Sequence, residues 1–164
     1  MSLLGEIEDG VVDWLKARLS GWRSDAVIAY PGWSRFVKMT TPGTAVVVGV
    51  KGWRKTRAAD QYGLVDIVAV GQVWVKDQNL RGVSEQLRGS GVTGEGVGLF
   101  AASEAVLSHL EGQCISTTAG MSDGIETGDG ELMEFGEDIV SGGMSIMIID
   151  FEVVVKGVEV RELA

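Results

Sequence analysis

The sequence predicts an α+β fold, in which two main helices pack on a mixed, mainly antiparallel sheet of about four to five strands. Two segments carry apolar residues at the three- and four-residue steps of an amphipathic helix. Several others are β-branched and apolar, or alternate between apolar and polar residues, as strands do. These segments follow the order helix, two strands, a long strand, helix and two more strands. Because no repeat or shift in composition divides them, we expect residues 1–164 to form a single domain.

The first helix is expected over residues 6–22. Acidic residues lie in its first turns and Lys16 and Arg18 near its end, which is the order that the helix dipole favours. A second helix is expected over about residues 99–111. The residues that carry the helical spacing are Ile7, Val11, Trp14, Leu15, Leu19 and Trp22 in the first helix, and Leu99, Phe100, Ser103, Val106, Leu107 and Leu110 in the second.

Three strands are expected between the helices. Residues 26–30 form a short strand that ends at the turn signal Pro31-Gly32. Residues 44–50 are apolar on both faces, which is typical of a strand covered on both sides. Residues 61–76 show the strongest alternation, so we expect this strand to lie at the centre of the sheet. Its predicted inward face is Val65, Ile67, Ala69, Val73 and Val75.

Two further strands are expected after the second helix. A short one, at residues 131–135, lies in a stretch rich in glycine and acidic residues, and a long one follows the turn Ser141-Gly142-Gly143. We expect flexible loops near residues 51–62, 89–98 and 120–130, the second because it holds five glycines in ten residues. The predicted inward face of the last strand is Met147, Ile149, Phe151, Val153 and Val155.

The composition disfavours several kinds of partner. Lys and Arg total 14 against 23 Asp and Glu, and the resulting net charge of −9 repels phosphate backbones, which argues against tight nucleic-acid binding. The single cysteine cannot form an internal disulfide and no secretory leader is recognisable, so we expect a reducing cytoplasm. No apolar run approaches the roughly 20 residues that a membrane helix needs, so we expect no membrane contact.

Residue types that commonly carry catalysis are sparse. His109 is the only histidine and Cys114 the only cysteine, so neither a histidine-based metal cluster nor a Cys-His pair is supported. We interpret His109 as a surface or satisfied side chain and Cys114 as a small buried hydrophobe. The glycines of residues 89–94 match a dinucleotide-binding turn, but polar residues in place of a strand precede them, which favours a loop. We therefore expect no catalytic residue, no metal and no cofactor.

A basic segment and an acidic stretch are the candidates for an interface. Four of the 14 basic residues lie in residues 51–57, and seven of the 23 acidic ones in residues 123–138. Trp and Arg are preferred interface anchors. For the acidic stretch, a solvated or subunit-facing surface is favoured over a calcium loop or paired catalytic carboxylates. The predicted interface residues are Lys51, Trp53, Arg54, Lys55 and Arg57 on the basic side, and Asp129, Glu131 and Glu134 on the acidic side.

The order of elements resembles the tail-terminator proteins of long-tailed bacteriophages along nearly the whole chain. Tyr30-Pro31-Gly32 after a short strand, and Asn79-Leu80-Arg81-Gly82 with a glycine-containing loop after the long strand, look like the tail-terminator or tail-completion family of Mu-like prophages. The resemblance implies a virion tail protein, assembled in the cytoplasm of the host bacterium. Such a protein forms a hexameric ring that caps the tail tube, stops its polymerisation and faces the head-side connector, without catalysis.

The resemblance also implies the partners. These are further copies of the chain in the ring, the tail-tube protein and the head–tail connector proteins, with DNA only passing through the lumen. An acidic lining would let DNA pass without adhering to it. Two alternatives stay open: another tail or neck component, such as a tail-tube or head–tail joining subunit, and a small enzyme or ligand-binding domain built on scattered acidic residues.

Overall fold

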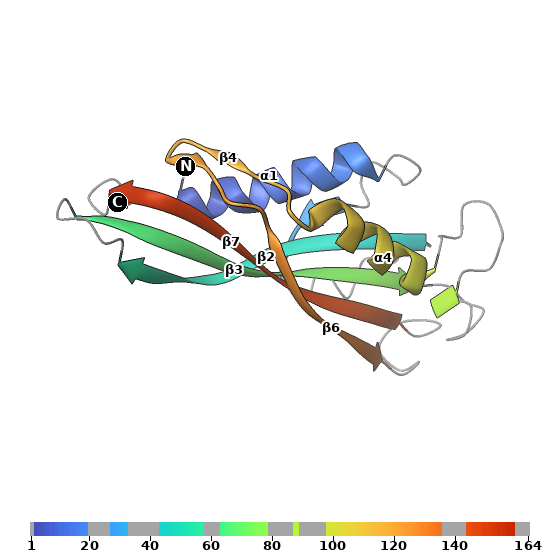
Figure 1. Cartoon of the computed structure of the whole chain (residues 1–164). Coiled ribbons are helices and arrows are strands. Elements are labelled where there is room, and N and C mark those ends of the chain that lie inside the picture. The colour runs from blue at the N-terminus through green and yellow to red at the C-terminus, as the bar shows by residue number, and fades with distance from the viewer. Residues whose placement is uncertain are drawn as a thin grey trace.

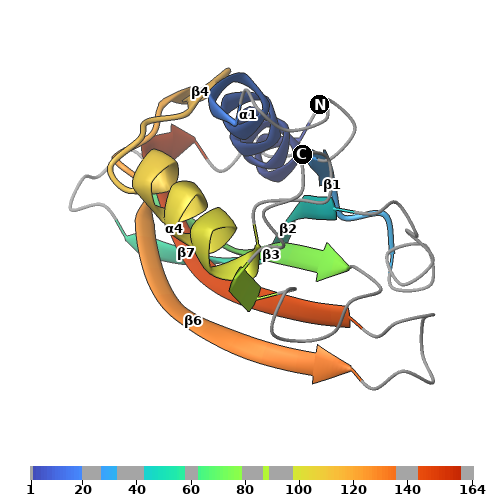
Figure 2. The same cartoon turned by 90° about the vertical axis from the view of Figure 1, so that its right-hand side faces the viewer.

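The computed structural model describes residues 2–19, 27–32, 43–57, 63–78, 87–88, 98–135 and 144–159. Helices α1 and α4 cover one face of a five-stranded sheet with the order β1-β2-β3-β7-β6 (Figure 1, Figure 2). Only β1 and β2 are parallel neighbours in this sheet, so the predicted α+β fold with a mixed, mainly antiparallel sheet is confirmed. The elements are α1 (Leu3–Arg18), β1 (Val27–Ala29), β2 (Gly43–Arg57), β3 (Leu64–Gln78), α4 (Leu99–Leu110), β4 (Ser116–Thr117), β5 (Gly120–Met121), β6 (Glu126–Phe135) and β7 (Met144–Glu159).

Helix α1 begins before the predicted residue 6, because the Ser2 side chain caps it. The Ser2 hydroxyl accepts a hydrogen bond from the N–H of Gly5 at 3.1 Å, which satisfies one of the first free amides of the helix. The helix ends at Arg18, and the predicted position 22 lies outside the described residues. The buried side chains of α1 are Leu3, Ile7, Val11, Val12 and Leu15.

Strand β3 lies between β2 and β7 at the centre of the sheet, which confirms its predicted position. All five residues of its predicted inward face are buried in the core under the helices. Gly71 interrupts this face because the ring of Phe151, on β7, fills the space above it. A Cβ on Gly71 would lie 2.4 Å from Cζ of Phe151. The missing side chain in β3 therefore makes room for the fully buried ring of Phe151.

The prediction of a loop near residues 51–62 is wrong in its first part, because β2 continues as a strand through Arg57. After a bulge between Val50 and Gly52, residues 52–57 pair with residues 65–70 of β3. Four of these six residues are charged or polar, but β3 pairs with the backbone N–H and C=O groups on its side of the strand. Pairing with an already formed strand thus extends β2 despite an unfavourable side-chain pattern.

The prediction of a loop near residues 120–130 is also wrong in part. Strands β4 and β5 form a small antiparallel hairpin, and β6 begins at Glu126 instead of residue 131. The buried Ser122 side chain holds this region, since its hydroxyl accepts from the N–H of Ile115 at 2.7 Å and donates to the carbonyl of Asp123 at 2.8 Å. Residues 79–82 of the tail-terminator resemblance, residues 89–97 of the predicted glycine loop and the turn 141–143 lie outside the described residues.

Candidate assembly interface

Residues 51–57 of β2, here called the basic edge, lie on one outer side of the sheet. β1 pairs only with residues 46–48 of β2, and the N–H of Val50 donates to Oε2 of Glu8 in α1 at 3.0 Å. Beyond Val50, no strand in the described part of the chain pairs with this side. Trp53 is 58% exposed, and both Lys51 and Lys55 are exposed. The outer backbone groups of the basic edge thus have no strand partner among the described residues, and its lysines and Trp53 are exposed.

Arg54 is the one predicted interface residue for which the structure describes an ion pair within the chain. Its guanidinium donates from Nη1 and Nη2 to the two carboxylate oxygens of Glu152 on β7, at 2.8 Å each. This bidentate hydrogen bond spans β3 and lowers the pKa of Glu152, while the same contact raises the pKa of Arg54. Arg54 is thus largely neutralised within its own subunit, which leaves Lys51 and Lys55 as the uncompensated charges of the described basic edge.

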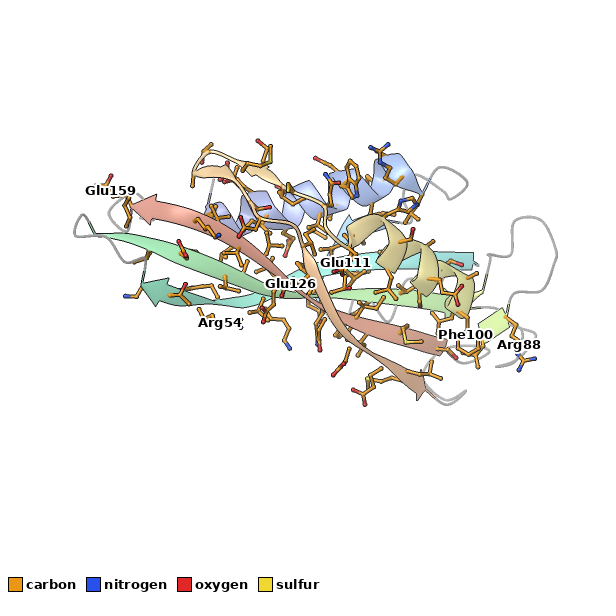
Figure 3. All side chains as sticks on the ribbon, viewed as in Figure 1. Arg54, Arg88, Phe100, Glu111, Glu126 and Glu159 are labelled. Carbon is orange, nitrogen blue, oxygen red and sulfur yellow. The ribbon has the colours of Figure 1, made fainter. Side chains whose placement is uncertain are left out.

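Residues 128–135 of β6, here called the acidic edge, lie on the opposite outer side of the sheet. Just before them, Thr127 donates from its N–H to Oε2 of Glu111 at 3.0 Å, and its hydroxyl donates to the same oxygen. These bonds lower the pKa of Glu111 and tie the start of β6 to the end of α4 (Figure 3). Asp129 and Glu131 are exposed, and no described strand pairs with the outer side of β6. The side chains of Glu134 and Arg57 lie outside the described residues.

The structure does not bring the basic and acidic edges together within one chain. They are separated by β3 and β7, and three strand spacings of about 4.8 Å amount to roughly 14 Å. They also lie at opposite ends of the strands, since Arg54 is paired with Val68 of β3 whereas Glu131 is paired with Ile148 of β7. Any direct contact between the two edges must therefore involve two chains.

His109 lies in the last turn of α4, and Cys114 follows the end of that helix. The side chain of His109 is partly buried. The backbone carbonyl of His109 accepts a hydrogen bond from Nε1 of Trp14 at 2.8 Å. The interpretation of Cys114 as a buried hydrophobe is wrong, because Cys114 is exposed. Its neighbour Ile115 turns inward instead and packs on α1 where Gly10 leaves space. Within the described residues, no three His, Cys, Asp or Glu side chains are grouped so that they could hold a metal ion.

Sequence reasoning missed three features of this surface. Glu152 was not singled out, although it lies on the outward phase of the last strand, because its partner depends on strand register. Leu132 and Met133 on β6 are exposed beside the acidic residues. Lys76, on the face of β3 opposite the helices, is only 2% exposed, and burial lowers its pKa to about 8.

None of the described helices is long and apolar enough to cross a membrane.

Comparisons with known proteins support the fold. No sequence-family model and no curated protein matches the chain. Among solved structures, the chain is similar to one chain of a structure described as "Virion of native gene transfer agent (GTA) particle". The two share 17% sequence identity with a TM-score of 0.56, over 95% of this chain and 96% of the other. The likeness extends along both chains and shows a common fold.

Proposed function

We propose that this chain is a structural protein of a phage-type virion. The observation that carries the proposal is the likeness of fold over 95% of this chain to a chain of a gene transfer agent virion. Two open sheet edges of opposite charge add to it, because a virion component works by contact with copies of itself and with neighbouring proteins. Mechanistically, this role needs shape and surface charge and no reacting group.

Within the virion, we propose a place in the tail, where the chain caps the tail tube, stops its polymerisation and joins it to the head-side connector. The order of elements that resembles tail terminators is present in the described strands and helices. We propose a ring of about six copies, the closed arrangement that head-to-tail contacts generate when the rotation closes. Its partners would be the tail-tube and connector proteins, with DNA passing through the lumen and assembly taking place in the host bacterial cytoplasm.

Tube-growth experiments test this role. A phage tail-tube protein would be polymerised with increasing amounts of the purified chain, and the lengths of the resulting tubes would be measured by electron microscopy. We expect tubes that shorten as the chain is added and that carry a ring at one end. Tubes that grow to the same length at every ratio, without the chain bound, would refute the capping role.

The same experiment separates the capping role from the second candidate, another tail or neck component. That candidate is favoured by the same fold likeness, which does not distinguish one virion subunit from another. A tail-tube subunit would be incorporated along the whole tube, and a head–tail joining subunit would leave tube length unchanged and bind the connector. Gold labelling of the chain on the tubes shows which of these distributions occurs.

A further inference from the structure

The two outer edges of the sheet begin in the same way. On β2, the N–H of Val50 donates to the carboxylate of Glu8 in α1. On β6, the N–H of Thr127 donates to the carboxylate of Glu111 at the end of α4. Each of these residues is followed by a break in strand register, between Val50 and Gly52 on β2 and between Thr127 and Gly130 on β6. Beyond these points each strand runs on without a described partner. Each helix glutamate thus marks where the open part of an edge starts.

The directions of the strands allow these open parts to pair. β2, β3, β7 and β6 alternate in direction, because each neighbouring pair among them is antiparallel. β6 therefore runs opposite to β2. When two copies lie side by side with the same face of the sheet turned the same way, β6 of one copy meets β2 of the next as an antiparallel pair. The junction would continue the pairing pattern already present inside each subunit.

The charges select which edges can meet. Among the described side chains, the exposed ions of the basic edge are Lys51 and Lys55, with Arg54 held by Glu152, and those of the acidic edge are Asp129 and Glu131. Two basic edges repel each other, as do two acidic edges, so only unlike edges attract. An interface between unlike surfaces is heterologous, and copies joined by it form a ring when the rotation closes. This selection also protects the open strands from indiscriminate association.

The position of the edges sets the register of such a junction. Glu131 lies level with Ile148, Trp74 and, across the sheet, Val47, whereas the middle of the basic edge is at Arg54. To bring Glu131 of one copy level with Arg54 of the next, the copies must be shifted along the strands by about seven residues, or about 23 Å at 3.3 Å per residue. The four strands of one copy span about 19 Å across the sheet. Strands tilted by roughly 50° to the ring axis accommodate this stagger, close to the 35–45° typical of closed sheets.

We propose that the basic edge of one copy pairs as an antiparallel strand with the acidic edge of the next copy, so that the ring is held by a continuous sheet. The inference rests on the proposed ring-forming function and assigns the surface that closes the ring. Trp53, exposed on the basic edge, is paired with Ala69 of the inward face and would be covered at the junction by Leu132 of β6, which is exposed, apolar and paired with Met147 on the same face. The residues expected to meet are those of 51–57 and 128–135.

Charge reversal on each edge separately tests the pairing. Variant A carries Lys51→Glu and Lys55→Glu, so that carboxylates replace the two uncompensated lysines and both of its edges expose acidic side chains. Variant B carries Asp129→Lys and Glu131→Lys, so that both are basic. We expect each variant alone to lose at least 90% of the assembled species at 20 mM salt, measured by analytical ultracentrifugation. An equimolar mixture should recover it, with equal numbers of A and B in every ring by native mass spectrometry, because A and B must alternate.

Two matched variants control for net charge. Lys16→Glu with Arg88→Glu gives the same net charge as variant A, and Asp13→Lys with Glu104→Lys gives that of variant B. All four positions are exposed and none belongs to either edge. Both control variants should assemble like the wild type. If they fail as A and B do, or if A and B each form rings alone, or if the mixture does not recover, the edge pairing is wrong.

Hydrogen exchange distinguishes strand pairing from side-chain attraction. In wild-type rings, amides within residues 51–57 and 128–135 should exchange at least tenfold more slowly than in the monomer, whereas those of β3 should change little. Rings without this protection would overturn the strand pairing and leave the proposed function standing. A wild-type chain that forms no ring, even with tail-tube protein present, would instead count against the proposed function.

Discussion

The centre of the sheet and its two edges are built on different principles. In the centre, β3 and β7 bury one full face, including Ala69, Val73 and Phe151, each 0% exposed. At the edges, the same backbone carries charged and exposed side chains, among them Trp53 and Glu131. Burial of apolar area stabilises the fold in proportion to the area removed from water, and exposed charges contribute little to it. The centre therefore accounts for the stability of the fold, and we propose that the edges determine with what the chain assembles.

The largest expected contrast is between two aromatic residues. Phe151→Ala should lower the free energy of unfolding by about 3–5 kcal/mol, because it leaves a cavity in the core. Trp53→Ala, which removes a ring that is 58% exposed, should change it by less than about 0.5 kcal/mol but weaken assembly. Urea unfolding of the monomer and sedimentation of the assembled form measure the two effects. A Trp53→Ala chain as unstable as Phe151→Ala would contradict the division between centre and edge.

A pair of glycines gives a smaller contrast of the same kind. Gly71→Ala should destabilise the chain by about 1–3 kcal/mol through overpacking, since the new methyl group would meet Phe151 at 2.4 Å. Gly52→Ala, at the start of the basic edge, has nothing within 4 Å of the added carbon and should be neutral or slightly stabilising. Thermal unfolding of the two variants, followed by circular dichroism, compares them directly. Equal losses would mean that the space around Phe151 adjusts to a methyl group.

The same division explains how much could be predicted from the sequence. The central strand and both helices were predictable because elements buried on one face repeat apolar residues at a regular spacing. The same spacing predicted the inward faces of β3 and β7. Residues 52–57 were not, because their strand conformation depends on pairing with β3 and leaves no apolar period. Cys114 was misassigned because it is Ile115, one residue later, that points inward. Hydrophobic spacing in a sequence indicates which residues are buried, whereas the position of a strand at the edge of a sheet depends on which strands pair.

The candidate site was predictable only as a list of residues. The charges of Lys51, Lys55, Asp129 and Glu131 can be read from the sequence, and so can their segregation into two segments. Their places at diagonally opposite corners of the sheet depend on the register of four strands. The Arg54–Glu152 pair has the same origin, since 98 positions separate the two residues in the chain. Register is set by long-range pairing, which one sequence does not display.

The smallest expected effect sharpens the distinction between residues of the basic edge. Arg54 and Glu152 are exposed enough that solvent screens their ion pair, so removing it should change the stability of the monomer only slightly. The sign of its pH dependence follows from the lowered pKa of Glu152. The contribution is present above the unfolded-state value near 4.5 and is lost as the pH falls through the lower folded-state value. A double-mutant cycle with Arg54→Ala and Glu152→Gln should show a smaller coupling energy at pH 3 than at pH 7.

In assembly, Lys55, which has no ion pair among the described residues, should matter more than Arg54, which is already paired with Glu152. Arg54 already has its partner, so Arg54→Ala removes little attraction toward another chain. Lys55, which has no ion pair in the described part of the chain, keeps its full charge for the acidic edge of a neighbour. Lys55→Ala should therefore weaken assembly more than Arg54→Ala, and the difference should shrink as added salt shortens the Debye length. If Arg54→Ala is the more damaging variant, Arg54 must leave Glu152 when two copies dock, and the junction exchanges an internal ion pair for an external one.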